Sequence, residues 1–342
     1  MTTTMDLLAD VASERILILD GAMGTQIQGF KFDEDAFRGE TFRDWNRPLK
    51  GNNDLLNLTQ PDAIRDIHAR YIAAGSDMIE TNTFSATTIA MADYAMESVA
   101  DDIAAEGARL AREAADAVSR PVAVLGTIGP TNKTLSLSPD VNDPGFRDIT
   151  FEDVRLAYEA QARAMAPYVD ALLIETIFDT LNAKAAIKAV MDADLGLPMI
   201  ISGTITDASG RTLSGQTAEA FWYSVRHAKP WAVGLNCALG AELMRPYIAA
   251  FSKIADTRII AYPNAGLPNA FGEYDETPSE TAGFLEEWAT SGLVNILGGC
   301  CGTTPEYIKA IARGARGKAP RAIPSSAPVM RLSGLEPFEL VS

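Results

Sequence analysis

The stretch VNILGGCCGT, residues 294–303, joins a short apolar run to two adjacent cysteines with glycines on both sides. The apolar run, 294–297, predicts a buried strand, and glycine permits the tight turn that follows it. Neighbouring side chains of an extended strand point to opposite faces, so Cys300 and Cys301 face a common point only where the chain turns. We therefore interpret this stretch as the end of a strand that carries two thiols.

Strands of the same kind recur along the chain, and helical patterns separate them. Short, continuously apolar runs rich in Val, Ile and Leu are typical of parallel strands that helices cover. Eight consecutive β-α units predict an α/β fold, a single (β/α)8 TIM barrel, and a doubly wound open sheet is the alternative. The predicted strands cover residues 16–19, 78–83, 122–127, 171–176, 199–204, 232–236, 258–262 and 294–297. The predicted helices cover residues 5–13, 61–74, 85–119 with a break near 97–101, 151–166, 180–194, 217–227, 241–255, 279–291 and 304–313.

Long polar segments follow some of these strands. Residues 30–57 and 129–148 hold more chain than plain connections need and are rich in residues that favour turns, so we expect long loops at the C-terminal face of the barrel. After the closing helix, the chain becomes richer in Pro, Ser and Ala. We predict a barrel domain over residues 1–316 and a C-terminal tail or linker over residues 317–342.

The 342-residue chain is strongly acidic, with 45 Asp and Glu against 29 Lys and Arg and a net charge of -16. This charge repels phosphate backbones and anionic lipid surfaces, so nucleic acid is not expected as a partner. No apolar run approaches the ~20 residues that span a bilayer, and no membrane partner is expected. Three cysteines make no disulfide framework, and residues 1–10 lack the features of a secretory signal. We expect a soluble protein of the reducing cytoplasm.

Polar side chains gather where the predicted strands end. In a TIM barrel the C-terminal ends of all strands meet at one rim, where catalytic groups lie. Residues far apart in the sequence are therefore expected at one mouth: Asp20, Glu80, Thr81, Glu175, Cys237, Asn264, Cys300 and Cys301. These include every cysteine of the chain, and core packing alone does not explain why all of them follow strands.

Three cysteine sulfurs at one point would form a catalytic metal site. Soft thiolates favour zinc among the common divalent ions, and three protein ligands leave one tetrahedral position open for a substrate. Cu(I) and iron-sulfur clusters fit less well, since a cluster usually takes four cysteines. Two other interpretations remain: the cysteines are small buried hydrophobes, or Cys300 and Cys301 form a strained, redox-active disulfide.

A thiol is the substrate that such a site would activate. A free thiol has a pKa near ~8.5 and is mostly protonated at neutral pH, whereas a zinc-bound thiol is deprotonated. Three thiolates make zinc a weak Lewis acid, so alkyl transfer to sulfur is favoured over hydrolysis. Asp20 and Glu175 could accept hydrogen bonds from an ammonium, and backbone N–H groups of residues 21–25 could hold a carboxylate. An amino-acid thiol fits this description.

These polar residues also have simpler interpretations. Asp20 and Glu175 could cap helices or pair with cations of the loops. Asn264, in the stretch YPNAG, could be an ordinary turn residue. His68 and His227 lie on predicted helices, and we assign them no chemistry.

Five motifs carry a resemblance to a known family: DGAMGT at 20–25, ETNTF at 80–84, GLNC at 234–237, YPNAG at 262–266 and GGCCGT at 298–303. With them the chain resembles the homocysteine-binding, zinc-dependent S-methyltransferases over nearly its whole length. Within that family it is most similar to the N-terminal homocysteine module of the cobalamin-dependent methionine synthases. The tail motif RLSGLEP, 331–337, contributes to this, because it resembles the segment that leads into their folate-binding barrel.

The resemblance implies a role for each matching residue. Cys237, Cys300 and Cys301 are implied zinc ligands, in agreement with the interpretation from the residues alone. Asn264 is similar to the oxygen donor that holds the fourth zinc position before the substrate displaces it. The residues implied to contact the amino and carboxylate groups of homocysteine are Asp20, Gly21, Thr81 and Glu175.

The resemblance also implies a reaction of methionine biosynthesis. The zinc-activated thiolate of L-homocysteine attacks the methyl group of methylcobalamin, which gives methionine and cob(I)alamin. Methylcobalamin would be carried by a cobalamin- and folate-binding methionine synthase subunit or module, and neither a corrin site nor a folate site is expected on this chain. Two alternatives stay open: a homocysteine methyltransferase that uses betaine or S-methylmethionine, and a non-catalytic zinc-binding barrel subunit.

Overall fold

The structure is a computed structural model that describes residues 3–206 and 209–340. Eight parallel strands form one sheet in the order β1-β8-β7-β6-β5-β4-β3-β2. A parallel bridge between Leu19 and Met78 joins the two outer strands, so the sheet closes on itself. The strands are β1 (Leu17–Ile18), β2 (Met78–Glu80), β3 (Ala123–Ile128), β4 (Ala171–Ile177), β5 (Met199–Gly203), β6 (Ala232–Gly240), β7 (Arg258–Asn264) and β8 (Ile296–Leu297). The predicted TIM barrel is confirmed, and the open sheet is excluded.

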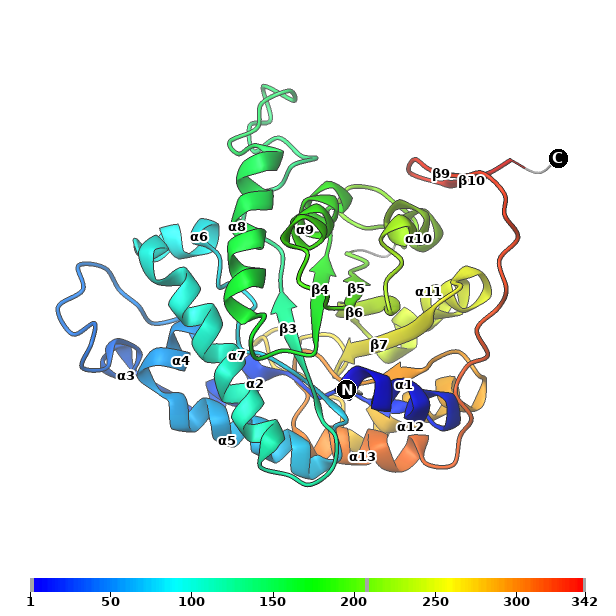
Figure 1. Ribbon diagram of the computed structural model, residues 1–342, viewed down its shortest axis with the longest axis horizontal. Coiled ribbons are helices and arrows are strands. Elements are labelled where there is room, and N and C mark those ends of the chain that lie inside the picture. Colours follow the sequence, from blue (N-terminus) through cyan, green and yellow to red (C-terminus); the bar gives the residue numbers. More distant parts are fainter. Residues whose placement is uncertain (1–2, 207–208, 341–342) are drawn as a thin grey trace.

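Helices alternate with the strands and form the outer layer (Figure 1). Each buries an apolar face against the sheet, and the resulting core between strands and helices runs around the barrel. The main helices of this layer are α5 (Pro61–Ala74), α7 (Ala100–Asp116), α8 (Phe151–Met165), α9 (Thr180–Ala193), α10 (Ala218–Val225), α11 (Ala241–Ile254), α12 (Pro278–Thr290) and α13 (Pro305–Ala315).

A second apolar core fills the inside of the barrel. Alternate strand residues such as Leu17, Leu125 and Ile260 point inward, as the period-2 geometry of a strand requires. Helix α1 (Thr4–Glu14) adds Met5 and Leu8 to the same core. The N-terminal end of the barrel is therefore plugged, and the opposite end is left for the polar residues.

The segment 30–57 differs from the long loop that the sequence predicts. It begins at the end of α2 (Met23–Phe30) and contains α3 (Glu34–Arg38), a 3-10 turn (Asn53–Leu55) and the start of α4 (Leu56–Thr59). Asp33 caps α3 through a hydrogen bond from the N–H of Ala36, and Phe37 and Leu49 are buried. These short helices form because local caps and a few apolar anchors outweigh the turn-forming composition.

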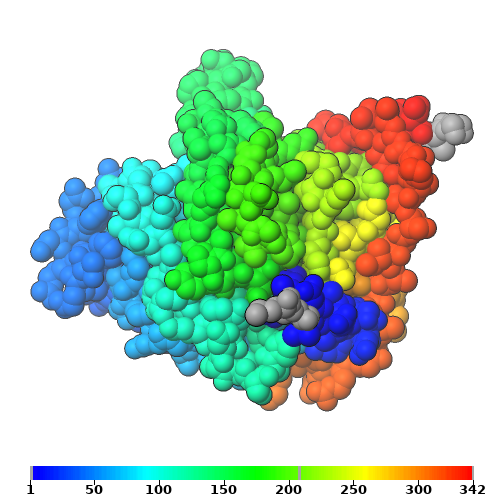
Figure 2. All heavy atoms as spheres, viewed as in Figure 1, coloured from blue at the N-terminus to red at the C-terminus, as the bar shows by residue number. Residues whose placement is uncertain are grey.

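The predicted helix over 85–119 is broken, as expected. The structure has α6 (Thr88–Met91), 3-10 turns at Ala92–Tyr94 and Glu97–Val99, and then α7. The loop between β3 and α8 has no helix or strand over residues 129–150 and projects beyond the ring of helices (Figures 1 and 2).

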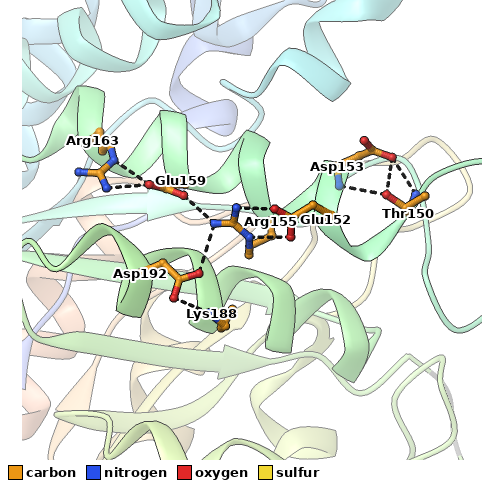
Figure 3. Close-up of polar contacts among 8 residues, drawn as sticks. All are labelled: Thr150, Glu152, Asp153, Arg155, Glu159, Arg163, Lys188 and Asp192. Atoms are coloured by element: carbon orange, nitrogen blue, oxygen red, sulfur yellow. Dashed lines mark hydrogen bonds and ion pairs between the residues drawn. The ribbon is translucent and has the colours of Figure 1, made fainter.

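Helix α8 has a capped N-terminus, charge pairs along its surface and one ion pair to α9 (Figure 3). Thr150 and Asp153 form a reciprocal capping box at its N-terminus. Farther along, Arg155 bonds to Glu152 and Glu159, and its Nη1 lies 3.3 Å from Asp192 of α9. Pairs near the surface stabilise a helix by only tenths of a kcal/mol each, so most of the stability of α8 comes from its buried apolar face.

The C-terminal segment is more ordered than a plain tail. Strands β9 (Arg331–Ser333) and β10 (Pro337–Glu339) form an antiparallel hairpin. Its polar face packs against α10, where Ser333 Oγ donates a hydrogen bond to the Ala220 carbonyl at 2.6 Å. Its apolar cross-strand pair, Leu332 and Phe338, is 54% and 53% exposed. The domain boundary after residue 316 stays a prediction, and residues 341–342 of the predicted tail lie outside the described residues.

No helix in the described part of the chain has both the length and the apolar character that crossing a bilayer requires.

Candidate metal centre

The three cysteines meet at the C-terminal end of the barrel. Cys237 lies in β6, and Cys300 and Cys301 lie in the turn that follows β8. Their sulfur atoms all lie within 4.8 Å of one another, and Cys237 Sγ is 3.9 Å from Cys301 Sγ. All three are free and partly buried. Among the described residues, this is the one group of three or more His, Cys, Asp or Glu side chains that converges in this way.

Irregular backbone brings Cys237 to this point. Cys237 and Ala238 have φ angles of 58° and 57°, in the left-handed region that costs a non-glycine residue roughly 1 kcal/mol or more. The pairing of β6 with β7 slips between Asn236 and Gly240. This bulge turns the Cys237 side chain out of the regular alternation, and strain of this kind is typical of functional sites.

Backbone hydrogen bonds hold the turn that carries the other two cysteines. The N–H of Cys300 donates to the carbonyl of Pro263 at 2.8 Å, and the N–H of Ala265 donates to the carbonyl of Cys301 at 2.9 Å. A Cβ at Gly298 would lie 3.0 Å from the carbonyl oxygen of Asp20. The close approach of these chains therefore requires glycine, which confirms the turn that the sequence predicts.

The electrostatics of the three thiols favour a bound cation. Hydrogen bonds from Cys237 and Cys300 lower the pKa of Cys301. Hydrogen bonds with Cys237 and Cys301, together with burial and the neighbouring sulfur charges, raise the pKa of Cys300 well above its ordinary value. Without a cation one thiolate therefore forms at the expense of the others, and a soft metal ion is what allows all three to ionise.

A cluster of buried carboxylates lies at the same end of the barrel. Asp20 is 2% exposed, and its Oδ2 accepts a hydrogen bond from the N–H of Glu80 at 3.1 Å. Glu175 is 4% exposed and accepts from the Tyr262 hydroxyl at 3.1 Å. The other oxygen of Asp20, Oδ1, and Oε1 of Glu80 are buried and have no partner among the described residues. These oxygens form a set of acceptors for a ligand with several N–H donors.

Burial shifts the acid-base behaviour of this cluster. Burial and then the neighbouring Glu175 charge raise the pKa of Asp20 well above its ordinary value, and burial raises the pKa of Glu175 to about 7. The pKa of Glu80 is raised by burial and by the charges of Glu175 and Asp20. A cation brought among these groups would favour their ionised forms, so the cluster is suited to bind an ammonium.

Gly21 and the N-terminus of α2 follow Asp20 directly. A Cβ at Gly21 would lie 2.8 Å from Thr303 Oγ1 and 2.9 Å from the Tyr71 ring, so only glycine fits there. Helix α2 has Ala22 at its N-cap, without a side-chain cap. The N–H groups of its first turn are thus available to an anion. The sequence predicts a loop over residues 21–25, whereas the helix already begins at Met23.

Thr81 and Asn264 have different surroundings. The Thr81 hydroxyl accepts from the N–H of Thr127 at 2.9 Å and lies 2.6 Å from the Thr83 hydroxyl, so it is already engaged between strands. Asn264 ends β7 next to the cysteine turn, and its buried Oδ1 has no partner among the described residues. An unpartnered buried oxygen of this kind could serve as a ligand to a bound cation.

The sequence predicts no function for three further residues of the site. It places Glu80 at the rim of the barrel but indicates no role for it. Asn236 and Tyr262, which both bond to Glu175, lie inside the motifs GLNC and YPNAG. Asn236 directly precedes Cys237, and Tyr262 lies two residues before Asn264. This proximity was the available signal, but the direction of a hydrogen bond cannot be read from sequence.

Comparisons with known proteins agree with this geometry. A family model described as homocysteine S-methyltransferase matches residues 17–315. The fold is similar to that of the homocysteine methyltransferase MmuM from Escherichia coli in its metallated form, with a TM-score of 0.71 and 21% identity over 91% of this chain and 99% of that chain. For the oxidized form the TM-score is 0.71, with 20% identity over 90% of this chain and 98% of that chain. For the apo form the TM-score is 0.67, with 20% identity over 91% of this chain and 100% of that chain. At this identity the structural likeness shows a shared fold.

Proposed function

The chain belongs to the homocysteine S-methyltransferase family, and we propose that it transfers a methyl group from methylcobalamin, carried on a separate subunit or module, to the sulfur of L-homocysteine. The observation that carries the proposal is the convergence of three cysteine sulfurs within 4.8 Å at the barrel end that also holds Asp20 and Glu175. One part of this site suits a metal and the other suits an amino acid.

Zinc fits the sulfur donors. Cys237, Cys300 and Cys301 would hold it, and Asn264 would supply an oxygen before the substrate arrives. When bound, zinc would lower the pKa of an incoming thiol so that the thiol loses its proton at neutral pH.

The remaining residues would hold the amino-acid part of homocysteine. The unpartnered oxygens of Asp20 and Glu80, together with the Glu175 carboxylate, would accept hydrogen bonds from its ammonium. The first turn of α2, which follows Gly21, would donate to its carboxylate. Binding at both ends of the amino acid would fix the direction of the sulfur, and orientation of this kind contributes several kcal/mol to a bimolecular reaction.

The choice of donor rests on the tail motif RLSGLEP and is open to a direct assay. Metal-loaded, reduced protein is incubated with homocysteine and with methylcobalamin, betaine or S-methylmethionine, and methionine is quantified. We expect turnover with methylcobalamin and none with the other two. Turnover with betaine or S-methylmethionine, and none with methylcobalamin, would contradict the assignment of methylcobalamin as the methyl donor. Absence of methionine with every donor, from protein that binds zinc and homocysteine, would favour a non-catalytic subunit.

A further inference from the structure

The side chain of Asn236 lies between the carboxylate cluster and the cysteines. It is fully buried at the point where β6 leaves its regular pairing with β7. Its Nδ2 lies 3.3 Å from Glu175 Oε2, 2.7 Å from Thr176 Oγ1 and 4.0 Å from Cys300 Sγ. One amide group therefore reaches both parts of the proposed site.

Hydrogen-bonding partners fix which way this amide points. The backbone N–H of Thr176, which can only donate, bonds to Asn236 Oδ1 at 3.0 Å. The Ser202 hydroxyl donates to the same oxygen at 2.7 Å. Because the oxygen must face these donors, the NH2 group must face Thr176 Oγ1, Glu175 and Cys300.

The amide also joins two strained segments of backbone. Thr176, the residue after Glu175, has a φ of 55°, and Cys237 has a φ of 58°. Strand pairing slips at both places, between Ile174 and Ile177 and between Asn236 and Gly240. Strained conformations persist only where the surroundings over-determine them, and the hydrogen bonds of Asn236 supply that constraint for both segments.

We propose that Asn236 is a positioning residue that couples the substrate site to the metal site. One N–H of its amide bonds to Thr176 Oγ1, and the other is shared between the Glu175 carboxylate, which it orients, and Cys300 Sγ. The inference rests on the proposed function, because it assigns Glu175 to the ammonium of homocysteine and Cys300 to the metal. Groups that hydrogen-bond to metal ligands orient them, and their loss typically weakens metal binding 10- to 100-fold.

Replacement of the amide by a carboxylate tests the coupling. Asn236→Asp keeps the acceptor for Thr176 and Ser202, removes both donors and places a negative charge next to Glu175. In zinc-loaded protein, we expect the Kd for homocysteine, measured by calorimetry, to rise about 10-fold or more. We also expect zinc transfer to a chromogenic chelator to become about 10-fold faster or more.

Asn295→Asp is the matched control, since it makes the same chemical change at the other end of the barrel. Asn295 is also buried, accepts from the N–H of Ile259 at 2.9 Å and donates to the carbonyl of Arg321 at 2.9 Å. This variant should lose stability while its homocysteine Kd and zinc release stay within about twofold of the wild type, because its contacts are structural.

Ser202→Ala provides a milder test in case Asn236→Asp does not fold. It removes one of the two donors that orient the amide and leaves Asn236 in place. We expect a smaller change in the same direction, about two- to fivefold in both readouts. Wild-type values in folded Asn236→Asp, or in Ser202→Ala, would overturn the coupling. Failure of the wild type itself to bind homocysteine would instead overturn the proposed function.

Discussion

Cys237 Sγ lies 3.9 Å from Cys301 Sγ, although 64 residues separate the two cysteines in the sequence. Cys237 lies in β6 and Cys301 follows β8, and these strands are not neighbours, because β7 lies between them in the sheet. The sulfurs therefore meet beyond the end of β7, where Asn264 is the last residue. The bulge at Cys237 and the turn at Cys300 are the two features of the backbone that make this meeting possible.

Loss of one sulfur should remove the metal and leave the barrel intact. We predict that Cys300→Ala abolishes stoichiometric zinc binding and activity, because two thiolates do not complete the site. Far-UV circular dichroism should be unchanged, since Cys300 lies at the rim and only packs against the edge of the inner core, whose buried members are strand and α1 residues. One zinc per chain in the purified variant, measured by elemental analysis, would remove Cys300 from the site.

Glu175 should act on substrate binding more than on the chemical step. Glu175→Gln replaces a charge-assisted hydrogen bond with a neutral one, which corresponds to about 1.5–3 kcal/mol or roughly a 10- to 100-fold rise in KM for homocysteine. The zinc content should not change. Glu286→Gln is the control, because Glu286 is exposed and pairs only with Lys318 in the described structure, at 3.3 Å. Equal KM values for wild type and Glu175→Gln would exclude Glu175 from the ammonium site.

The strands and the meeting of the cysteines were predictable because both follow from strong, simple patterns. An apolar run such as 171–176 predicts a buried strand, and parallel strands place the residues that follow them at one rim. Cys237, Cys300 and Cys301 could thus be brought together from sequence. The short helices of the segment 30–57 could not be predicted, because they depend on single caps such as Asp33 and on burial of Phe37 in the folded protein.

The finer parts of the site depend on directions that sequence does not encode. The sequence shows that an asparagine stands at 236 but not where its amide points, and the Thr176 N–H and the Ser202 hydroxyl fix that direction only in the folded chain. Glu80 could be placed at the rim, but its unpartnered oxygen is a property of the packed structure. The C-terminal hairpin reverses the usual pattern, with polar residues against α10 and Leu332 outward. The sequence around this hairpin lacks the apolar face of a packed strand, so it indicates part of a tail.

Arg321 should contribute to stability without affecting the site. It is buried, and its guanidinium donates to the carbonyls of Ser252, Ala255 and Thr257 at the C-terminal end of α11. Arg321→Ala leaves these carbonyls without partners, so we predict a loss of about 2–4 kcal/mol in the free energy of unfolding. Denaturant titration measures this loss. The exposed Arg316→Ala should change it by less than about 0.5 kcal/mol, and equal stability of both variants would contradict the prediction.

His68 should make stability depend on pH. It is fully buried on α5, neither ring nitrogen has a partner among the described residues, and burial lowers its pKa from 6.5 to about 4. Between these values the unfolded chain binds a proton that the folded chain does not. The folded state therefore keeps its full stability above the unfolded-state pKa. Below that pKa the free energy of unfolding decreases as the pH is lowered, by up to about 1.4 kcal/mol per pH unit for this group.

His68→Leu removes this proton-binding difference. Unfolding measured across the window from about pH 6.5 down to about pH 4 should show a steeper loss of stability for the wild type than for the variant. The comparison uses the change with pH in each protein, so a constant difference in stability between the two does not affect it. Parallel curves for wild type and variant would show that His68 does not titrate as burial requires.

The most direct test of the metal site is zinc-edge X-ray absorption on purified, reduced protein, before and after homocysteine is added. We predict one zinc per chain with three sulfur ligands and one lighter atom, and four sulfur ligands once homocysteine binds. Protein that carries no zinc, or a sulfur coordination that does not change with homocysteine, would contradict the central claim that three cysteines hold a metal to which a substrate thiol binds.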